Sequence, residues 1–196
     1  MWDERYATLE FAYGTRPNDF LAERVEIIPN GPVLELGCGE GRNAVFLAER
    51  GFEVTAVDQS SVGLAKAQRL AAERGVQINT VQADLNHYEI ESVAWAAIVS
   101  MWCHVPAPLR LRLHAAVPAG LRPGGVFVLE AYTPDQVGRG TGGPRDPDWM
   151  MSIKRLNEEL AGLKVLYAQE KERDVQEGEF HNGLSNVVQF IGQRAG

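Results

Sequence analysis

The chain has 196 residues, a formal net charge of −7 at pH 7 and a sequence pI of about 5.2. This length predicts a single domain over residues 1–196, and the acidic balance argues against nucleic acid as a partner. The two cysteines give no disulfide framework and have no metal-ligand spacing with the four histidines, so no metal site is expected. No signal-peptide order opens the chain and no apolar run is long enough to cross a bilayer, which predicts a cytoplasmic protein without a membrane partner.

Residues 1–28 are expected to form one or two short helices that are interrupted at 13–17. Asn18 or Asp19 is the expected cap of the second helix. The segment is rich in aromatic side chains, namely Trp2, Tyr6, Phe11 and Tyr13. We expect it to form a helical lid over a core that comprises residues 33–193.

The next segment joins a strand to a glycine-dense turn. Residues 33–41 read Val-Leu-Glu-Leu-Gly-Cys-Gly-Glu-Gly, and the amphipathic stretch 42–50 predicts a helix. Glycines let the backbone approach a ligand closely and adopt positive φ. Asp58 ends the following apolar strand, 17 residues after Gly41, where a carboxylate can accept hydrogen bonds from both hydroxyls of a ribose. This pairing predicts a nucleoside-containing cofactor across the first two strands.

The spacing of the glycines distinguishes between two cofactor classes. The dinucleotide fingerprint is G-x-G-x-x-G, but here the position three residues after Gly39 is occupied by Arg42. Glu35 lies in the strand, two residues before Gly37. The pattern E-x-G-x-G-x-G resembles the first motif of class I S-adenosylmethionine (SAM) dependent methyltransferases.

Strands and helices alternate along the rest of the core. The elements expected are strands at 53–57, 77–81, 96–101 and 126–131, and helices at 60–75, 109–117 and 149–161. Pro118 is expected to end or kink its helix, which is expected to be a surface helix with a solvated His114. The β-like runs 163–173 and 180–193 are too close for a helical crossover, so they predict an antiparallel hairpin. The predicted fold class is α/β, with a Rossmann-like seven-stranded methyltransferase sheet that is mostly parallel and ends in this C-terminal hairpin.

Ligands of open α/β sheets lie beyond the carboxyl ends of the strands. The residues placed there or in the motif are Glu35, Gly37, Cys38, Gly39, Asp58, Gln59, Asp84, Leu85 and Ser100. We assign Asp58 to the ribose, Asp84 to the adenine amino group and the amide of Leu85 to a ring nitrogen. Two alternatives stay open: Asp58 as a helix cap, and Asp84 as a turn residue before Asn86.

Further stretches are similar to the tellurite-resistance-type branch of class I methyltransferases. They are Ala-Asp-Leu-Asn at 83–86, Leu-Arg-Pro-Gly-Gly at 121–125 and Glu-Gly-Glu-Phe-His at 177–181. The resemblance implies SAM as the cofactor, bound at Gly37, Gly39, Asp58, Asp84 and Leu85. It also implies a polar substrate near His181. That branch has an arginine after its histidine, whereas this chain has Asn182, which argues against an oxyanion substrate.

Methyl transfer from a sulfonium requires alignment and exclusion of water, and a base only when the acceptor arrives protonated. The candidates for catalysis are His104 after the fourth strand, Tyr132 after the fifth and His181 in the tail. The alternative for His104 is a neutral histidine packed under Trp102. Residues 138–145, with four glycines in eight residues, are expected to form a second lid, the alternative being a disordered connection.

Together these patterns predict a SAM-dependent methyltransferase that acts on a small polar acceptor by in-line transfer. A non-catalytic SAM-binding module is one alternative. An NAD-linked oxidoreductase is another, disfavoured by the glycine spacing and by the lack of a second mononucleotide half.

Overall fold

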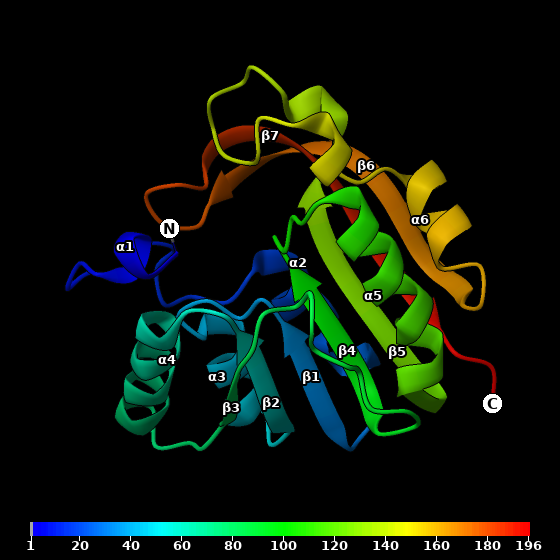
Figure 1. Ribbon diagram of the computed structural model, residues 1–196, viewed down its shortest axis with the longest axis horizontal. Helices are drawn as coiled ribbons and strands as arrows, with labels where there is room; N and C mark the ends of the chain where they lie inside the picture. The colour runs from blue at the N-terminus through cyan, green and yellow to red at the C-terminus, as the bar shows by residue number, and fades with distance from the viewer. Residues whose placement is uncertain (1) are drawn as a thin grey trace.

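The computed structural model describes residues 2–196, which form one seven-stranded sheet with helices on both faces (Figure 1). The strand order is β3-β2-β1-β4-β5-β7-β6. The strands are β1 (Pro32–Leu36), β2 (Glu53–Asp58), β3 (Asn79–Gln82), β4 (Trp95–Met101), β5 (Leu121–Tyr132), β6 (Lys164–Gln176) and β7 (Asn182–Gln193). The first five strands pair in parallel, whereas β7 runs antiparallel to both β5 and β6. The predicted fold class is confirmed.

Two helical layers cover the sheet. The helices are α1 (Trp2–Tyr6), α2 (Asp19–Arg24), α3 (Arg42–Glu49), α4 (Ser61–Glu73), α5 (Ala107–Gly120) and α6 (Ile153–Glu159), with short 3-10 turns η1 (Val25–Ile27), η2 (Pro134–Gln136) and η3 (Pro147–Trp149). One apolar cluster joins α2, α3 and α4 to the sheet through residues such as Phe20, Leu47 and Leu64. A second joins α5 and α6 to the other face through Leu113 and Leu156.

The central strand β4 explains why both layers are needed. All seven of its residues are buried, and they alternate between the two clusters, as Ile98 and Val99 illustrate. A strand of this kind must be covered on both faces, as its continuous apolar run predicts. The parallel strands therefore end together at one edge, where the glycine loop also lies.

Local capping follows the sequence in two places. Asn18 caps α2, because its Oδ1 accepts a hydrogen bond from the amide of Leu21 at 3.0 Å. Ser60 caps α4, because its Oγ accepts from the amide of Gly63 at 3.0 Å. Both caps set the entry of a helix beside the ligand edge of the sheet.

The structure corrects three expectations about helices. The helix expected to end or kink at Pro118 does not end there but continues to Gly120, because proline has a helical φ and removes only one backbone donor near this end; a kink at Pro118 stays a prediction. The helix expected at 149–161 is restricted to α6, because Ser152 caps it and η3 precedes it. His114 was expected to be solvated, but it is 4% exposed and its Nδ1 lies 2.6 Å from Glu159 Oε2.

Candidate cofactor and acceptor site

The glycine loop between β1 and α3 depends on backbone conformations that favour glycine. Gly37, Gly39 and Gly41 have φ of 68°, 54° and 82°. A Cβ at Gly41 would lie 2.4 Å from the Cβ of Ala67 on α4, so this glycine lets the loop pack closely on that helix. Because Gly41 makes the close contact, Arg42 is free to direct its long side chain elsewhere.

Asp58 holds the glycine loop in place. Its Oδ2 accepts a hydrogen bond from the amide of Gly39 at 2.8 Å, and its Oδ1 accepts from the amide of Ser60 at 2.9 Å. The side chain is nearly buried, and this burial raises its pKa. The carboxylate therefore lies beside the loop at the end of β2, where a ribose is expected, and its role toward the ribose stays a prediction.

Glu35 lies beneath the loop and carries an unpaired oxygen. It is 1% exposed, and its Oε1 accepts from Asn43 Nδ2 at 3.0 Å, while Oε2 has no hydrogen-bond partner within residues 2–196. Burial raises its pKa to about 7, despite the hydrogen bond from Asn43. Cys38 is also buried, which raises its pKa well above the usual value, so it is no activated thiolate.

The remaining cofactor candidates differ in accessibility. Asp84 is exposed, and its Oδ1 accepts from both the amide and the Nδ2 of Asn86, at 2.8 and 2.9 Å. This is the turn that was left open as the alternative for Asp84. Leu85 is buried, Gln59 is exposed after Asp58, and Ser100 lies buried inside β4. Their roles toward a cofactor stay predictions.

The N-terminal segment is folded down over the glycine loop, and Figure 1 shows α1 beside α4 at this end of the sheet. Tyr6 is 4% exposed, and a Cβ at Gly39 would lie 2.8 Å from its hydroxyl oxygen. Asp3 Oδ1 accepts a hydrogen bond from Ser60 Oγ at 2.5 Å. The segment therefore contacts the loop and the start of α4 at once.

Lys66 of α4 holds this segment. Its Nζ donates to the carbonyls of Tyr6, Thr8 and Glu10, at 3.3, 3.0 and 2.7 Å. The same ammonium forms an ion pair with Glu40 of the glycine loop at 2.5 Å. One buried cation thus links the N-terminal segment to the loop.

Both ring nitrogens of His104 form hydrogen bonds with the backbone. Its Nε2 accepts from the amide of Tyr132 at 2.9 Å, so in the neutral ring Nδ1 is the nitrogen that donates to the carbonyl of Trp102 at 3.1 Å. Burial lowers its pKa to about 4. As placed, His104 has no free lone pair for a proton, which favours the alternative of a neutral histidine packed beside Trp102, with ring centroids 6.4 Å apart.

His181 lies among aromatic rings. Its ring centroid is 4.7 Å from Tyr13, 5.0 Å from Trp102 and 5.4 Å from Tyr132. The ring is buried, its Nδ1 has no partner in the described part of the chain, and burial lowers its pKa to about 3. Of the two candidate histidines, His181 is the one with a ring nitrogen still free.

The glycine-rich stretch 138–145 packs against this cluster. Gln136 Nε2 donates to Thr141 Oγ1 at 2.8 Å, and the amide of Asn182 donates to the Thr141 carbonyl at 3.1 Å. A Cβ at Gly143 would lie 2.8 Å from the Tyr132 ring. The stretch is therefore held against the start of β7, and its role as a lid stays a prediction.

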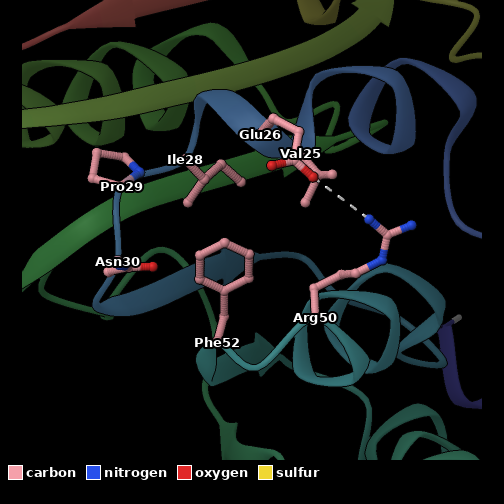
Figure 2. A pocket seen from close by; sticks show the side chains of 7 residues that line it. All are labelled: Val25, Glu26, Ile28, Pro29, Asn30, Arg50 and Phe52. Carbon is pink, nitrogen blue, oxygen red and sulfur yellow. Dashed lines mark ion pairs between the residues drawn. The ribbon is translucent and has the colours of Figure 1, made fainter.

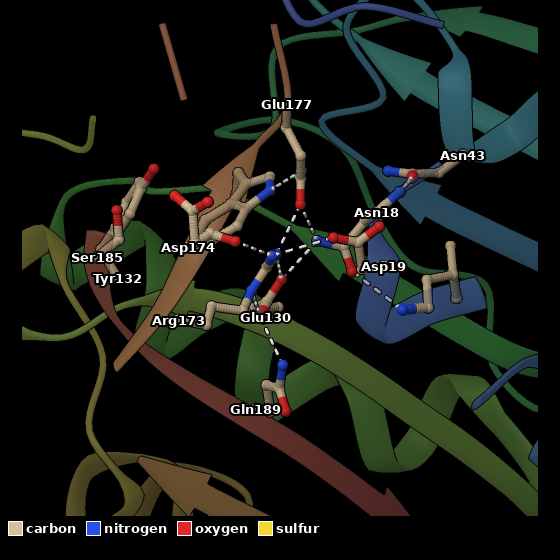
Figure 3. A network of polar contacts seen from close by, with 12 residues as sticks. Asn18, Asp19, Asn43, Glu130, Tyr132, Arg173, Asp174, Glu177, Ser185 and Gln189 are labelled. Carbon is tan, nitrogen blue, oxygen red and sulfur yellow. Dashed lines mark hydrogen bonds and ion pairs between the residues drawn. The ribbon is translucent and has the colours of Figure 1, made fainter. Parts of the chain in front are cut away.

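A buried polar network lies beside these rings (Figure 3). Glu130, which is 0% exposed, accepts two hydrogen bonds from Arg173, at 2.9 and 2.7 Å, and others from Asn18 and Gln189, at 2.5 and 2.6 Å. Glu177 accepts from further donors in the same network. The sequence prediction named neither Asn18 nor Arg173 for this role; the one signal for the network was a glutamate at position 130 in an otherwise apolar strand.

Two surface hollows lie away from the glycine loop. The first, of about 410 Å³, is lined by residues that include Asn30, Arg50 and Phe52 (Figure 2). Asn30 precedes β1 and Phe52 precedes β2, so this hollow lies at the amino ends of the strands, opposite the ligand edge. The second, of about 380 Å³, lies between α2 and the β6–β7 hairpin.

Within residues 2–196, no three or more histidine, cysteine, aspartate or glutamate side chains are grouped so that they would hold a metal ion. None of the helices in the same range has the length and apolar character needed to cross a membrane.

The fold has solved relatives. The structure of TehB from Haemophilus influenzae matches 98% of this chain and 65% of its own, with a TM-score of 0.75 and 18% sequence identity. Residues 33–125, which contain the glycine loop and Asp58, match the family model described as a methyltransferase domain. The chain has the class I methyltransferase fold.

Curated relatives match parts of the chain. The chain is 35% identical to the uncharacterized methyltransferase YodH of Bacillus subtilis over 72 residues, which is 37% of this chain and 31% of that protein. It is 30% identical to the 2-heptyl-1-hydroxyquinolin-4(1H)-one methyltransferase of Mycobacteroides abscessus over 114 residues, which is 54% of this chain and 50% of that protein. The chain thus spans half or less of the length of these two relatives.

Proposed function

We propose that this protein is a SAM-dependent methyltransferase that transfers the methyl group in line to a small polar acceptor. The observation that carries the proposal is the glycine loop closed by Asp58 within a methyltransferase domain. The dinucleotide alternative is disfavoured because Arg42 stands where that fingerprint requires glycine. The sheet also ends in a hairpin rather than in a second mononucleotide half.

The residues of the loop fit SAM chemically. Gly37 and Gly39 adopt the positive φ that the tight loop requires, and Asp58 offers a carboxylate for a diol. Glu35 Oε2 is a buried acceptor without a partner among residues 2–196, suited to a cationic or hydrogen-bonding group. When bound, SAM supplies a methyl group activated on a sulfonium. The contribution of the chain is to hold this group and to exclude water, and Tyr6 above Gly39 is placed to do so.

On the acceptor side, we propose that His181 takes the proton when the acceptor arrives protonated. Its Nδ1 has no hydrogen-bond partner among the described residues, so this nitrogen is available to an acceptor. His104 is proposed to orient Tyr132 through the backbone amide rather than to move a proton.

The charge near the rings supports an acceptor that is not an anion. Arg42 and Arg173 are held by Glu177 and Glu130, so little positive charge is free. A small hydroxyl, thiol or amine acceptor is therefore proposed at least as readily as a tellurite- or selenite-like anion. The Mycobacteroides abscessus relative is named for a small hydroxyquinolone, which supports the hydroxyl class. Since Cys38 and Cys103 are both free thiols, we propose that the protein acts in the cytoplasm.

Calorimetry with SAM, S-adenosylhomocysteine and NAD tests the cofactor. We expect binding of the first two, and tighter binding of NAD than of SAM would contradict the proposal. Transfer of an isotopically labelled methyl group to a metabolite extract, followed by mass spectrometry, then tests catalysis. Binding of SAM without any labelled product would instead support the non-catalytic SAM-binding module.

A further inference from the structure

The carboxylate of Glu177 gathers hydrogen bonds from several elements that are distant in sequence (Figure 3). It lies in the turn between β6 and β7 and is 4% exposed. Its Oε1 accepts from Asn18 Nδ2 at 3.1 Å and from Arg173 Nη2 at 2.6 Å. Its Oε2 accepts from Trp102 Nε1 at 2.6 Å and from Arg42 Nη2. A buried carboxylate is tolerated only when it is paired and hydrogen-bonded, and these donors meet that requirement.

The donors come from the two halves of the proposed site. Arg42 is the first residue of α3 and directly follows Gly41 of the glycine loop. Trp102 directly follows β4, on the acceptor side. The two side chains meet on the same oxygen of Glu177, so this atom joins the glycine loop to the end of β4.

Trp102 needs such a support. Its φ is 56°, in the left-handed region that a tryptophan rarely adopts. Its amide donates to the carbonyl of Glu130 at 2.9 Å, and its indole nitrogen donates to Glu177. The centroid of its ring lies 4.4 Å from that of Tyr132 and 5.0 Å from that of His181. The orientation of the Trp102 ring therefore determines the surface that packs against both of these side chains.

Glu177 remains ionised throughout the physiological range. Burial opposes its ionisation, but Arg42 and Arg173 outweigh burial and hold its pKa at about 2. The link between Arg42 and Trp102 is therefore a charged one, and replacing the carboxylate by an amide removes the charge while it keeps the size of the side chain.

We propose that Glu177 is a positioning residue for methyl transfer. It fixes the Trp102 ring relative to the glycine loop. Ligand binding at the loop therefore changes the surroundings of the Trp102 ring on the acceptor side. This inference rests on the proposed function, because it assigns the glycine loop to the cofactor and Trp102 to the acceptor.

Fluorine NMR of the full chain labelled with 5-fluorotryptophan tests this link, with S-adenosylhomocysteine as the probe. Trp102→Phe assigns the Trp102 resonance among those of the four tryptophans. In the wild type, we expect the probe to shift this resonance. In Glu177→Gln, we expect the probe to bind within about tenfold of its wild-type affinity, as measured by calorimetry, while the Trp102 shift is lost. Glu179→Gln, an exposed change in the same turn, should keep the shift.

The outcomes separate the two proposals. If the wild type does not bind the probe, the proposed function fails at its first step. If the wild type binds and Glu177→Gln keeps the full Trp102 shift, the positioning role is overturned while the proposed function stands. Where Glu177→Gln does not fold, Arg42→Gln breaks the link from the loop side, and retention of the shift there contradicts the inference equally.

Discussion

At the scale of single residues, the site depends on a few buried carboxylates that differ in their hydrogen-bond donors. Glu177 and Glu130 are paired with arginines, whereas Asp58 is bonded to the backbone amides of Gly39 and Ser60. Glu35 is satisfied on one oxygen. The carboxylates without arginine partners are thus those beside the glycine loop, where a ligand can complete their hydrogen bonding.

Asp58→Ala is expected to weaken binding of S-adenosylhomocysteine tenfold or more. The variant removes the proposed hydrogen bonds of a charged group to the ribose, each worth about 1.5–3 kcal/mol, and it also frees the amide of Gly39. Calorimetry measures the change, and circular dichroism verifies the fold. Glu53→Ala, an exposed change at the opposite end of β2, is the matched control. An unchanged dissociation constant for Asp58→Ala would place the ribose elsewhere.

Buried His181 makes stability depend on pH with a predictable sign. Its pKa is about 3 in the folded protein, whereas the pKa of a histidine in the unfolded chain is about 6.5. Stability from this group is thus complete above about pH 6.5 and is lost as the pH falls toward the folded value, because only the unfolded state takes up the proton. We expect His181→Gln to reduce the loss of unfolding free energy between pH 7 and pH 5 by on the order of 2 kcal/mol.

Urea unfolding of the wild type and His181→Gln at pH 7, 6 and 5 measures this difference. His87→Gln, which changes an exposed histidine, should follow the wild type. Parallel pH profiles for the wild type and His181→Gln would show that His181 is accessible to water in solution.

At the scale of elements, the N-terminal segment and the glycine loop are coupled through Lys66. Its ammonium holds three carbonyls of the segment and Glu40 of the loop, so loss of the ammonium releases both. We expect Lys66→Ala to speed amide hydrogen exchange in residues 2–13 when no ligand is present.

In the wild type, S-adenosylhomocysteine should slow exchange in residues 2–13 and 138–145, because a closed site excludes water.

Exchange measured by mass spectrometry, with and without the ligand, tests the lid. Glu73→Ala, at the exposed end of the same helix, should leave exchange in residues 2–13 unchanged. Equal exchange in both segments with and without ligand would remove the lid function.

The elements that could be predicted from sequence are those that local chemistry specifies. The glycine loop follows from residues 33–41, and the hairpin follows from the short gap between two β-like runs. The buried network could not be predicted in the same way, because the hydrogen bonds to Glu177 span separations from 4 to 159 residues. The burial of His114 was missed for the same reason: its partner Glu159 lies on α6, 45 residues away.

At the scale of the whole molecule, the N-terminal segment and the C-terminal hairpin meet at the ligand edge. Figure 1 shows the turn between β6 and β7 beside α1. The amide of Glu179 donates to the carbonyl of Ala12 at 3.0 Å, and the Arg5 guanidinium lies 4.6 Å from the Phe180 ring centroid. The N-terminal segment and the turn between β6 and β7 therefore lie against each other at this edge of the sheet.

These contacts lead to the prediction that residues 2–28 and 33–193 unfold together. Asn18 bridges the two parts, since its Nδ2 donates to both Glu130 and Glu177. Asn18→Ala removes one hydrogen bond from each of two buried carboxylates, and a hydrogen bond to a charged group contributes about 1.5–3 kcal/mol. We expect a lower unfolding free energy with a single transition in the wild type and the variant. Urea unfolding followed by tryptophan fluorescence and by circular dichroism should give coincident curves, and Asn157→Ala on the exposed side of α6 should match the wild type. Two separated transitions in the wild type would mean that the N-terminal segment is not part of the domain that binds the cofactor.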